Sequence, residues 1–215
     1  MSIIPDQRSW ATAGSSDNNK QEICDNLSGV MEDTTSVLEV ASGFGTHLEL
    51  LANTYKHVNF TASEAQAICL DKLTEVSDKF NNVSEPVEIN MMQLPQWLSG
   101  NHYDGLLAIN LIHISPYQVT TNLFKLGQDL KVKWISNYGA FKVNGQYGSD
   151  SDIRFDQSLK ERDSRWGLRD VDDVKKIATE HGFKLKIMKP TKANNWFMIW
   201  VNTASSFAGA LPQTP

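Results

Sequence analysis

The sequence predicts one α/β domain built on an open, mostly parallel β-sheet that ends in an antiparallel strand. Strand-type and helix-type segments alternate along most of the 215 residues, which is typical of parallel strands joined by helical crossovers. The last two strand-type runs, 184–189 and 195–201, are joined by a connection too short for such a crossover, so the final strand should run antiparallel. A chain of this length can bury a single sizeable core.

The individual elements follow from local patterns. The β-branched run at 36–41 predicts the first strand, and the nearly continuous apolar run at 103–112 is typical of a strand buried on both faces. Shorter runs predict further strands at 57–62, 86–90 and 132–139. Cap residues and apolar residues at helical spacing predict helices over 15–31, 46–55, 65–80, 116–130 and 170–183.

The remaining segments set the limits of the domain. A polar stretch of about thirty residues, 140–169, is predicted to be a loop, and a loop of that length often covers a binding site. Residues 1–15 are expected to be flexible and 16–202 to form the domain. The tail 203–215 has no periodicity and is predicted to be disordered.

The composition of the chain argues against several classes of protein. The net charge is -5, which argues against a protein that grips the phosphate backbone of nucleic acids. No segment resembles a secretory signal or is apolar enough to span a bilayer, so a cytoplasmic protein without membrane contact is expected. Cys24 and Cys69 are far apart and lack metal-ligand neighbours, so we expect free thiols and no metal site.

The most informative stretch is the handover from the first strand to the next helix through Gly43 and Gly45. Glycines there let the backbone approach a ligand closely. A dinucleotide normally requires a third small residue, where this chain has Leu48. S-adenosylmethionine instead suits an acid ahead of the glycines, and Glu39 has that place. A plain turn without a ligand is the structural alternative.

A second acid strengthens the ligand interpretation. Glu64 follows the second strand about twenty residues beyond the glycines, where a carboxylate can bond the ribose hydroxyls of a nucleoside. This acid does not distinguish nicotinamide cofactors from S-adenosylmethionine. Its structural alternative is a solvated residue at a helix start.

Several motifs together resemble the methyltransferase-like 26 family, and the resemblance covers roughly 16–201. They are "VLEVASGFGTH", "YDGLLAINLIHISPY", "FDQSLKERDSRWGLRDVDDV" and "ANN". The resemblance implies a Rossmann-like class I methyltransferase fold, in which helices cover both faces of a seven-stranded sheet whose last strand is antiparallel. It also implies S-adenosylmethionine binding at Glu39, Ala41, Gly43, Gly45 and Glu64. Ser42, in the same turn, is predicted to join them.

Four positions depart from the family pattern. Asn18 stands where arginine is usual, and Asp152 where asparagine is usual. Glu64 and Asn90 replace aspartates, but the Asn90 amide oxygen can still accept a hydrogen bond from adenine. Together these changes allow an altered acceptor pocket or a weakened enzyme.

Candidate groups for chemistry follow the fourth strand. His113 could take a proton from an acceptor at neutral pH, or it could be a structural histidine bonded to backbone. Asn110 could hold the amino-acid end of the cofactor or cap a turn.

Other candidates come from the fifth strand, the polar stretch and the chain ends. Among the aromatic residues at 138–155, Tyr138 is a catalytic candidate, whereas Phe155 is expected to fasten the loop to the sheet. The charged segment around Trp166 favours a salt-bridged scaffold over a catalytic cluster. Lys20, beside Asn18 and Asn19, is predicted to close over the cofactor. Asn194 and Asn195 are candidates for lining the same cleft.

The sequence therefore predicts an S-adenosylmethionine-dependent methyltransferase that acts on a small molecule, with the acceptor and the oligomeric state left open. Three alternatives stand beside it. One is a noncatalytic binding or scaffold protein with this fold, and another is a relative that catalyses a non-methyl reaction. The third, a nicotinamide-dependent oxidoreductase, is disfavoured by Leu48.

Overall fold

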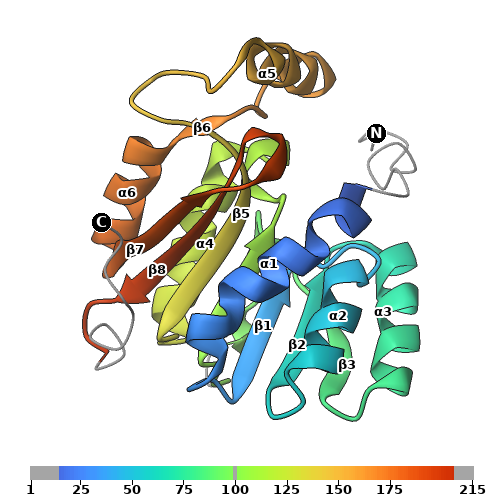
Figure 1. The fold of residues 1–215 in the computed structure, drawn as a ribbon. Helices are drawn as coiled ribbons and strands as arrows, with labels where there is room; N and C mark the ends of the chain where they lie inside the picture. The colour runs from blue at the N-terminus through green and yellow to red at the C-terminus, as the bar shows by residue number, and fades with distance from the viewer. Residues whose placement is uncertain (1–14, 99–100, 206–215) are drawn as a thin grey trace.

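The computed structural model describes residues 15–98 and 101–205. A twisted sheet lies between two layers of helices (Figure 1). Its main strands follow the order β3-β2-β1-β4-β5-β8-β7, and the short β6 pairs with β5. The strands are β1 (Ser36–Val40), β2 (Asn59–Glu64), β3 (Val83–Glu88), β4 (Gly105–Ile109), β5 (Trp134–Lys142), β6 (Arg169–Asp170), β7 (Phe183–Pro190) and β8 (Asn195–Asn202).

Helices α1, α2 and α3 pack against one face of the sheet, and α4 and α6 against the other (Figure 1). Helix α5 lies apart from both layers, above the carboxyl ends of the strands. The helices are α1 (Ser15–Met31), α2 (Thr46–Thr54), α3 (Ala67–Lys79), α4 (Tyr117–Asp129), α5 (Asp150–Arg162) and α6 (Val171–Glu180). Short 3-10 turns are η2 (Gln96–Leu98), η3 (Ile112–Ile114) and η4 (Lys192–Asn194).

The strand directions confirm the predicted fold class. Strands β1, β2, β3, β4 and β5 pair in parallel, whereas β8 runs antiparallel to both β5 and β7. The order of strands reverses between β1 and β4, because the chain first builds outward to β3 and then returns to the other side of β1. In open α/β sheets, this reversal opens a crevice for ligands at the carboxyl ends.

Alternation along the central strands explains the two layers. On β1, Val37 packs with α1, α2 and α3, whereas its neighbour Leu38 packs with α4 and α6. On β4, Leu107 and Leu106 divide in the same way. Successive side chains of a strand point to opposite faces, so a continuous apolar run is needed where helices cover both.

One element differs from the prediction. The stretch 140–169 is not a loop, because β5 continues to Lys142 and α5 occupies Asp150–Arg162. The buried positions of α5 are Asp152, Asp156 and Leu159, so the helix has no apolar stripe that a periodicity search could find. In the segment around Trp166, this ring packs with Leu159 of α5, and the Arg162 guanidinium lies 5.5 Å from the ring centroid. These contacts suit a scaffold, and its role stays a prediction.

The predictions for the two ends of the chain fall mostly outside the described residues. Only residue 15 of the predicted flexible segment 1–15, and 203–205 of the predicted tail 203–215, are described. In the described ranges, no helix combines the length and the apolar character needed to cross a bilayer.

Candidate functional site

The predicted site residues gather where the carboxyl ends of β1, β2, β4 and β5 meet. Glu39 and Glu64 lie at the ends of β1 and β2, next to the turn that carries Gly43. Asn110 and His113 follow β4, on the other side of the point where the strand order reverses. The site therefore has two sides, which we call the β1–β2 side and the β4–β5 side.

The turn between β1 and α2 depends on left-handed backbone angles. Ala41, Gly43 and Gly45 have φ values of 55°, 57° and 80°. Ser42 fastens this turn to both strands: its backbone N–H donates to the Ser63 carbonyl at 2.9 Å, and its hydroxyl donates to the Glu39 carbonyl at 3.1 Å. The turn is thus held in one conformation above the strand ends.

The two glycines of the turn have different roles. A Cβ on Gly45 would lie 3.0 Å from Val76 and 3.2 Å from Leu73, so this glycine lets α2 pack against α3. A Cβ on Gly43 would meet no described atom within 4 Å. Gly43 therefore borders open space, where a ligand can approach the backbone.

Glu64 is held against this turn. Its Oε2 accepts the Gly43 N–H at 3.1 Å, and its Oε1 accepts the Ala65 N–H at 2.8 Å. Burial raises the pKa of Glu64, while these two backbone donors oppose the shift. The carboxylate is consequently oriented by the backbone and retains lone pairs for a further donor.

Glu39 has a buried carboxyl group with one oxygen that lacks a hydrogen-bond partner in the described part of the chain. Its side chain is 2% exposed, and its Oε2 has no hydrogen-bond partner among residues 15–98 and 101–205. Burial raises the pKa of Glu39 to about 8, a hydrogen bond from Ser42 opposes this shift, and the Glu64 carboxylate adds to it. A buried carboxyl normally has a partner. A cationic ligand group beside Glu39 would supply one, so the residues present fit the ammonium of S-adenosylmethionine.

The first helix is fastened near the same turn through a residue that the sequence analysis missed. His47, in the first turn of α2, lies with its Nε2 2.8 Å from Asn19 Oδ1 of α1. Burial and the nearby Lys20 charge lower the pKa of His47 to about 4, against the opposing effect of Asp17. The available signal was a histidine in the first turn of a helix that follows a glycine turn. Lys20 itself pairs with Asp17 at 2.5 Å.

Asn90 lies at the outer margin of the β1–β2 side, just beyond β3. Its side-chain oxygen accepts the Met92 N–H at 2.9 Å, which closes a local turn. Since an amide oxygen has two lone pairs, the predicted contact with adenine stays open to it.

On the β4–β5 side, the strand ends are tied together. Asn110 has φ 55°, and its backbone N–H donates to the Tyr138 carbonyl at 2.8 Å. The Tyr138 hydroxyl accepts a hydrogen bond from Asn195 Nδ2 at 3.0 Å. Asn194 binds the Ser149 and Ser151 hydroxyls at the start of α5. The predicted cleft residues Asn194 and Asn195 therefore connect α5 with Tyr138 in the middle of β5.

His113 is confined on several sides. Its side chain is 5% exposed, and its Nδ1 has no hydrogen-bond partner in the described part of the chain. A Cβ on Gly139 would lie 2.8 Å from that nitrogen. Phe155 meets the imidazole edge to face at 5.5 Å between centroids, so this aromatic contacts a candidate residue as well as fastening α5.

The protonation state of His113 is set by its burial. Burial, with a contribution from the Arg169 charge, lowers the pKa of His113 to about 4. The imidazole is therefore neutral at neutral pH, as a proton acceptor must be. The surrounding apolar atoms disfavour the charged ring, and the predicted role of His113 as proton acceptor stays a prediction.

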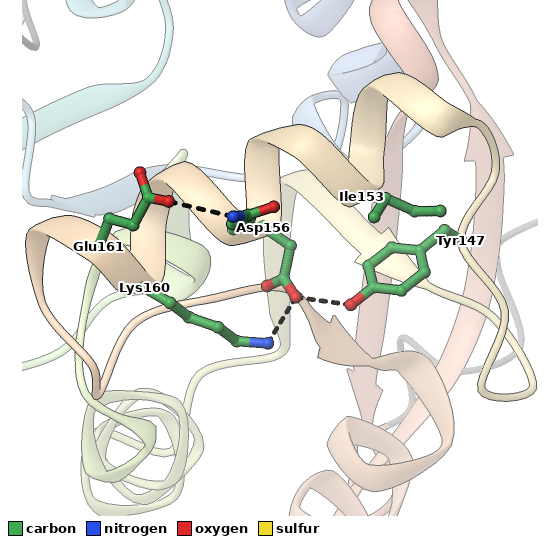
Figure 2. Close-up of a pocket in the computed structure, with 6 residues that line it drawn as sticks. Tyr147, Ile153, Asp156, Lys160 and Glu161 are labelled. Atoms are coloured by element: carbon green, nitrogen blue, oxygen red, sulfur yellow. Dashed lines mark hydrogen bonds and ion pairs between the residues drawn. The ribbon is translucent and has the colours of Figure 1, made fainter.

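Beside α5, a shallow depression of about 420 Å³ is lined by Tyr147, Ile153, Asp156, Gln157, Lys160 and Glu161. Figure 2 shows Asp156 at its centre, bonded to the Tyr147 hydroxyl and to the Lys160 ammonium, each at 2.6 Å. Asp156 also accepts the Leu168 N–H at 2.7 Å. Both oxygens of this carboxylate therefore accept hydrogen bonds that hold α5 in place. The depression contains none of the predicted site residues, and no group of three or more potential metal ligands occurs within the described ranges.

Comparison with solved structures defines the class of fold. An O-methyltransferase family protein from Burkholderia thailandensis superposes with a TM-score of 0.74 at 13% identity, covering 93% of this chain and 64% of that chain. The human N-acetylserotonin methyltransferase, solved in complex with SAM, gives 0.65 at 12% identity over 91% of this chain and 53% of that chain. Magnesium protoporphyrin IX methyltransferase (ChlM) from Synechocystis, solved with bound SAH, gives 0.63 at 13% identity, covering 86% and 83%.

These similarities establish a Rossmann-like methyltransferase fold, and the chain spans less than two thirds of the first two proteins. A family model described as a protein of unknown function (DUF938) matches residues 10–202. The chain belongs to the DUF938 family. Its resemblance to the methyltransferase-like 26 family stays a prediction.

Proposed function

We propose that this protein binds S-adenosylmethionine and transfers its methyl group to a small-molecule acceptor. The observation that carries the proposal is the buried Glu39 carboxyl, which lies at the strand-order reversal beside the Gly43 turn. A turn that served only to connect β1 with α2 would need neither a buried acid nor open space over Gly43. The structural relatives solved with SAM or SAH support the same cofactor.

Each residue on the β1–β2 side binds a different part of the cofactor. The Glu39 carboxylate faces the ammonium group, and the free lone pairs of Glu64 accept from the ribose hydroxyls. Gly43 offers backbone without a side chain to the ligand, while Asn90 is placed for the adenine amino group. Ala41, Ser42 and Gly45 contribute through the conformation of the turn, Lys20 from α1, and Asn110 from the turn after β4.

When bound at Glu39, Gly43 and Glu64, S-adenosylmethionine would supply an electrophilic methyl group for in-line transfer to a lone pair of the acceptor, with the thioether as leaving group. The protein aligns the acceptor and excludes water. Neutral His113 accepts the proton that the acceptor loses, at Nδ1, and passes it to solvent. Tyr138, fixed by Asn195, positions the acceptor beside the Asn110 turn.

A small acceptor fits the chain better than nucleic acid, because the net charge of -5 gives no attraction for phosphates. We expect the protein to act in the cytoplasm, away from membranes.

Calorimetric titration with S-adenosylmethionine, S-adenosylhomocysteine and NAD tests the proposal. We expect the first two to bind and NAD not to bind, because fully buried Leu48 leaves no third small residue at the start of α2. Tighter binding of NAD would contradict the proposal and favour an oxidoreductase.

A noncatalytic cofactor-binding protein is the second candidate, and the burial of His113 is what favours it. With this side chain only 5% exposed, an acceptor can reach its Nδ1 only if α5 or Phe155 moves. Tight cofactor binding without release of S-adenosylhomocysteine, across a broad metabolite panel, would support this candidate.

A further inference from the structure

The His113 imidazole has neighbours on several sides, and one of them is itself exposed. Gly139 of β5 borders its Nδ1, and the Gly167 N–H donates to the His113 carbonyl at 3.0 Å; both glycines are buried. Phe155 of α5 meets the ring edge to face at 5.5 Å between centroids, and 37% of its own surface is exposed. Among these neighbours, Phe155 therefore lies on the outer side of the imidazole.

Helix α5, which carries Phe155, is held by few apolar contacts. It lies apart from both helix layers (Figure 1), and its buried positions are Asp152, Asp156 and Leu159. Leu159 alone among these three joins an apolar cluster. A segment with little buried apolar surface opens locally at a lower free energy than the core does. Of the elements around His113, α5 is therefore the one best suited to move.

The start of α5 is fastened by exposed polar contacts, which we call the latch: Asn194, Ser149 and Ser151. The Asn194 Nδ2 donates to the Ser149 hydroxyl at 2.8 Å and to the Ser151 hydroxyl at 3.3 Å. Because both hydrogen bonds are exposed, water competes for their donors and acceptors, and their net contribution to stability is small. Such a latch can open without disturbing the core.

Two features of the closed arrangement cost free energy that opening would recover. Ala193 and Asn194 have φ values of 56° and 58°, in the left-handed region that alanine in particular disfavours. Asp152, in the first turn of α5, is 5% exposed, and its Oδ2 has no hydrogen-bond partner in the described part of the chain. Strained backbone next to a candidate site is typical of segments that change position.

We propose that Phe155 is a gate over His113, and that the gate opens when the latch releases the first turn of α5. In the open arrangement an acceptor reaches the imidazole, and closure then excludes water from it. This inference rests on the proposed function only for what passes the gate. The accessibility of His113 is a property of the chain itself and is measured without cofactor or acceptor.

Reaction with diethyl pyrocarbonate at about pH 7 tests the gate, because this reagent acylates the free lone pair of a neutral imidazole that it can reach. The pKa values of His113 and His47 are both lowered to about 4, so both rings are neutral at that pH and their rates report accessibility. Peptide mass spectrometry follows three histidines in one sample. Exposed His102 is the reachable reference, and buried His47, on the β1–β2 side, reports unfolding of the whole domain.

Phe155→Ala should raise the rate of modification of His113, relative to His102, by about tenfold or more, with His47 unchanged. The matched control is Ile153→Ala, which removes an apolar side chain of α5 that is 47% exposed and lines the depression instead. It should leave the His113 rate at the parent level.

The latch is tested by Asn194→Gly, since glycine adopts the left-handed φ without strain and removes only the side-chain amide. The rate at His113 should rise by about threefold or more, again with His47 unchanged.

An unchanged His113 rate in Phe155→Ala, with His47 still protected, would overturn the proposal. An equal rise in Ile153→Ala would also overturn it, because α5 would then be loosened by any truncation. If Phe155→Ala makes His47 reactive, that variant has lost its fold and Asn194→Gly decides: no selective rise at His113 there overturns the gate. Binding of S-adenosylhomocysteine is measured separately, so its absence would contradict the proposed function and leave the result for the gate standing.

Discussion

The two sides of the carboxyl edge are built differently. On the β1–β2 side, Glu39, Gly43 and Glu64 come from one continuous stretch, and backbone hydrogen bonds fix their geometry. On the β4–β5 side, the residues come from separate segments: the turn after β4, the end of β5, α5 and the start of β8. Under the proposed function, local structure would hold the cofactor, whereas tertiary contacts between distant segments would form the acceptor site.

The β4–β5 side should therefore depend more on single tertiary contacts, and Asp156 gives the largest expected effect. Asp156→Ala removes the acceptor for the Leu168 N–H, the Tyr147 hydroxyl and the Lys160 ammonium. Leaving the buried Leu168 N–H without an acceptor, and losing the hydrogen bonds from Tyr147 and Lys160, should lower the free energy of unfolding by about 3–5 kcal/mol. Denaturant unfolding measures this, with Asp150→Ala as the exposed control. A loss no larger than the control's would show that α5 is held by other contacts.

The second prediction separates the two glycines of the β1–β2 side. Gly43→Val should weaken S-adenosylmethionine binding by about a hundredfold or more, because its side chain would enter the open space over the turn. The left-handed φ of 57° adds a strain of about 1–2 kcal/mol, which the fold should survive.

Gly45→Val is the matched control for that prediction. Its side chain would press on Val76 and Leu73, so stability should fall by about 3 kcal/mol. Calorimetry and thermal unfolding on both variants distinguish the roles. If Gly43→Val kept its affinity for S-adenosylmethionine within a few-fold, the two glycines would serve only the conformation of the turn and not ligand binding.

The third prediction concerns the proton acceptor on the β4–β5 side. With an acceptor that must lose a proton, His113→Ala should reduce turnover by about a hundredfold while leaving cofactor affinity nearly unchanged. Since the pKa of His113 is lowered to about 4, its neutral form is present above that pH and is lost only as the pH falls through it. No step in rate near neutral pH should therefore belong to this residue. Release of S-adenosylhomocysteine by parent and variant, followed across pH, measures both effects. Equal rates at every pH would remove His113 from the mechanism.

The contrast between the two sides also explains what the sequence could predict. The alternation of strands and helices, the antiparallel β8 and the turn at Gly43 follow from patterns within short windows, namely apolar runs, the length of connections and glycine spacing. Glu39 and Glu64 could be found because they stand at fixed places relative to those patterns. The fold class and the grouping at the β1–β2 side were thus accessible from the sequence.

The remainder depends on distant contacts that no local pattern records. Helix α5 was missed because its buried side chains are two aspartates and a leucine, whose burial is set by Tyr147, Lys160 and Leu168. His47 was missed because its partner, Asn19, lies on another helix. The low pKa of His113 likewise arises from the atoms that enclose it, and these come from β5, α5 and β6.

The smallest predicted effect is the pH dependence of cofactor affinity on the β1–β2 side. Burial raises the pKa of Glu39 to about 8, so below that pH the carboxyl is mostly protonated and neutral in the unliganded protein. A cationic ligand prefers the ionised form, and binding must then release a proton. Affinity for S-adenosylmethionine should therefore rise roughly tenfold between about pH 6.5 and about pH 8.

The control for this prediction is Glu39→Gln, which keeps the shape of the neutral carboxyl but cannot ionise. Its affinity for S-adenosylmethionine should be weak and independent of pH over that range. Calorimetry in buffers of different ionisation enthalpy would detect the released proton directly. A parent protein whose affinity is flat over this range, with no proton released, would mean that Glu39 does not face the ligand's charge, and the β1–β2 side would then need another partner for the ammonium.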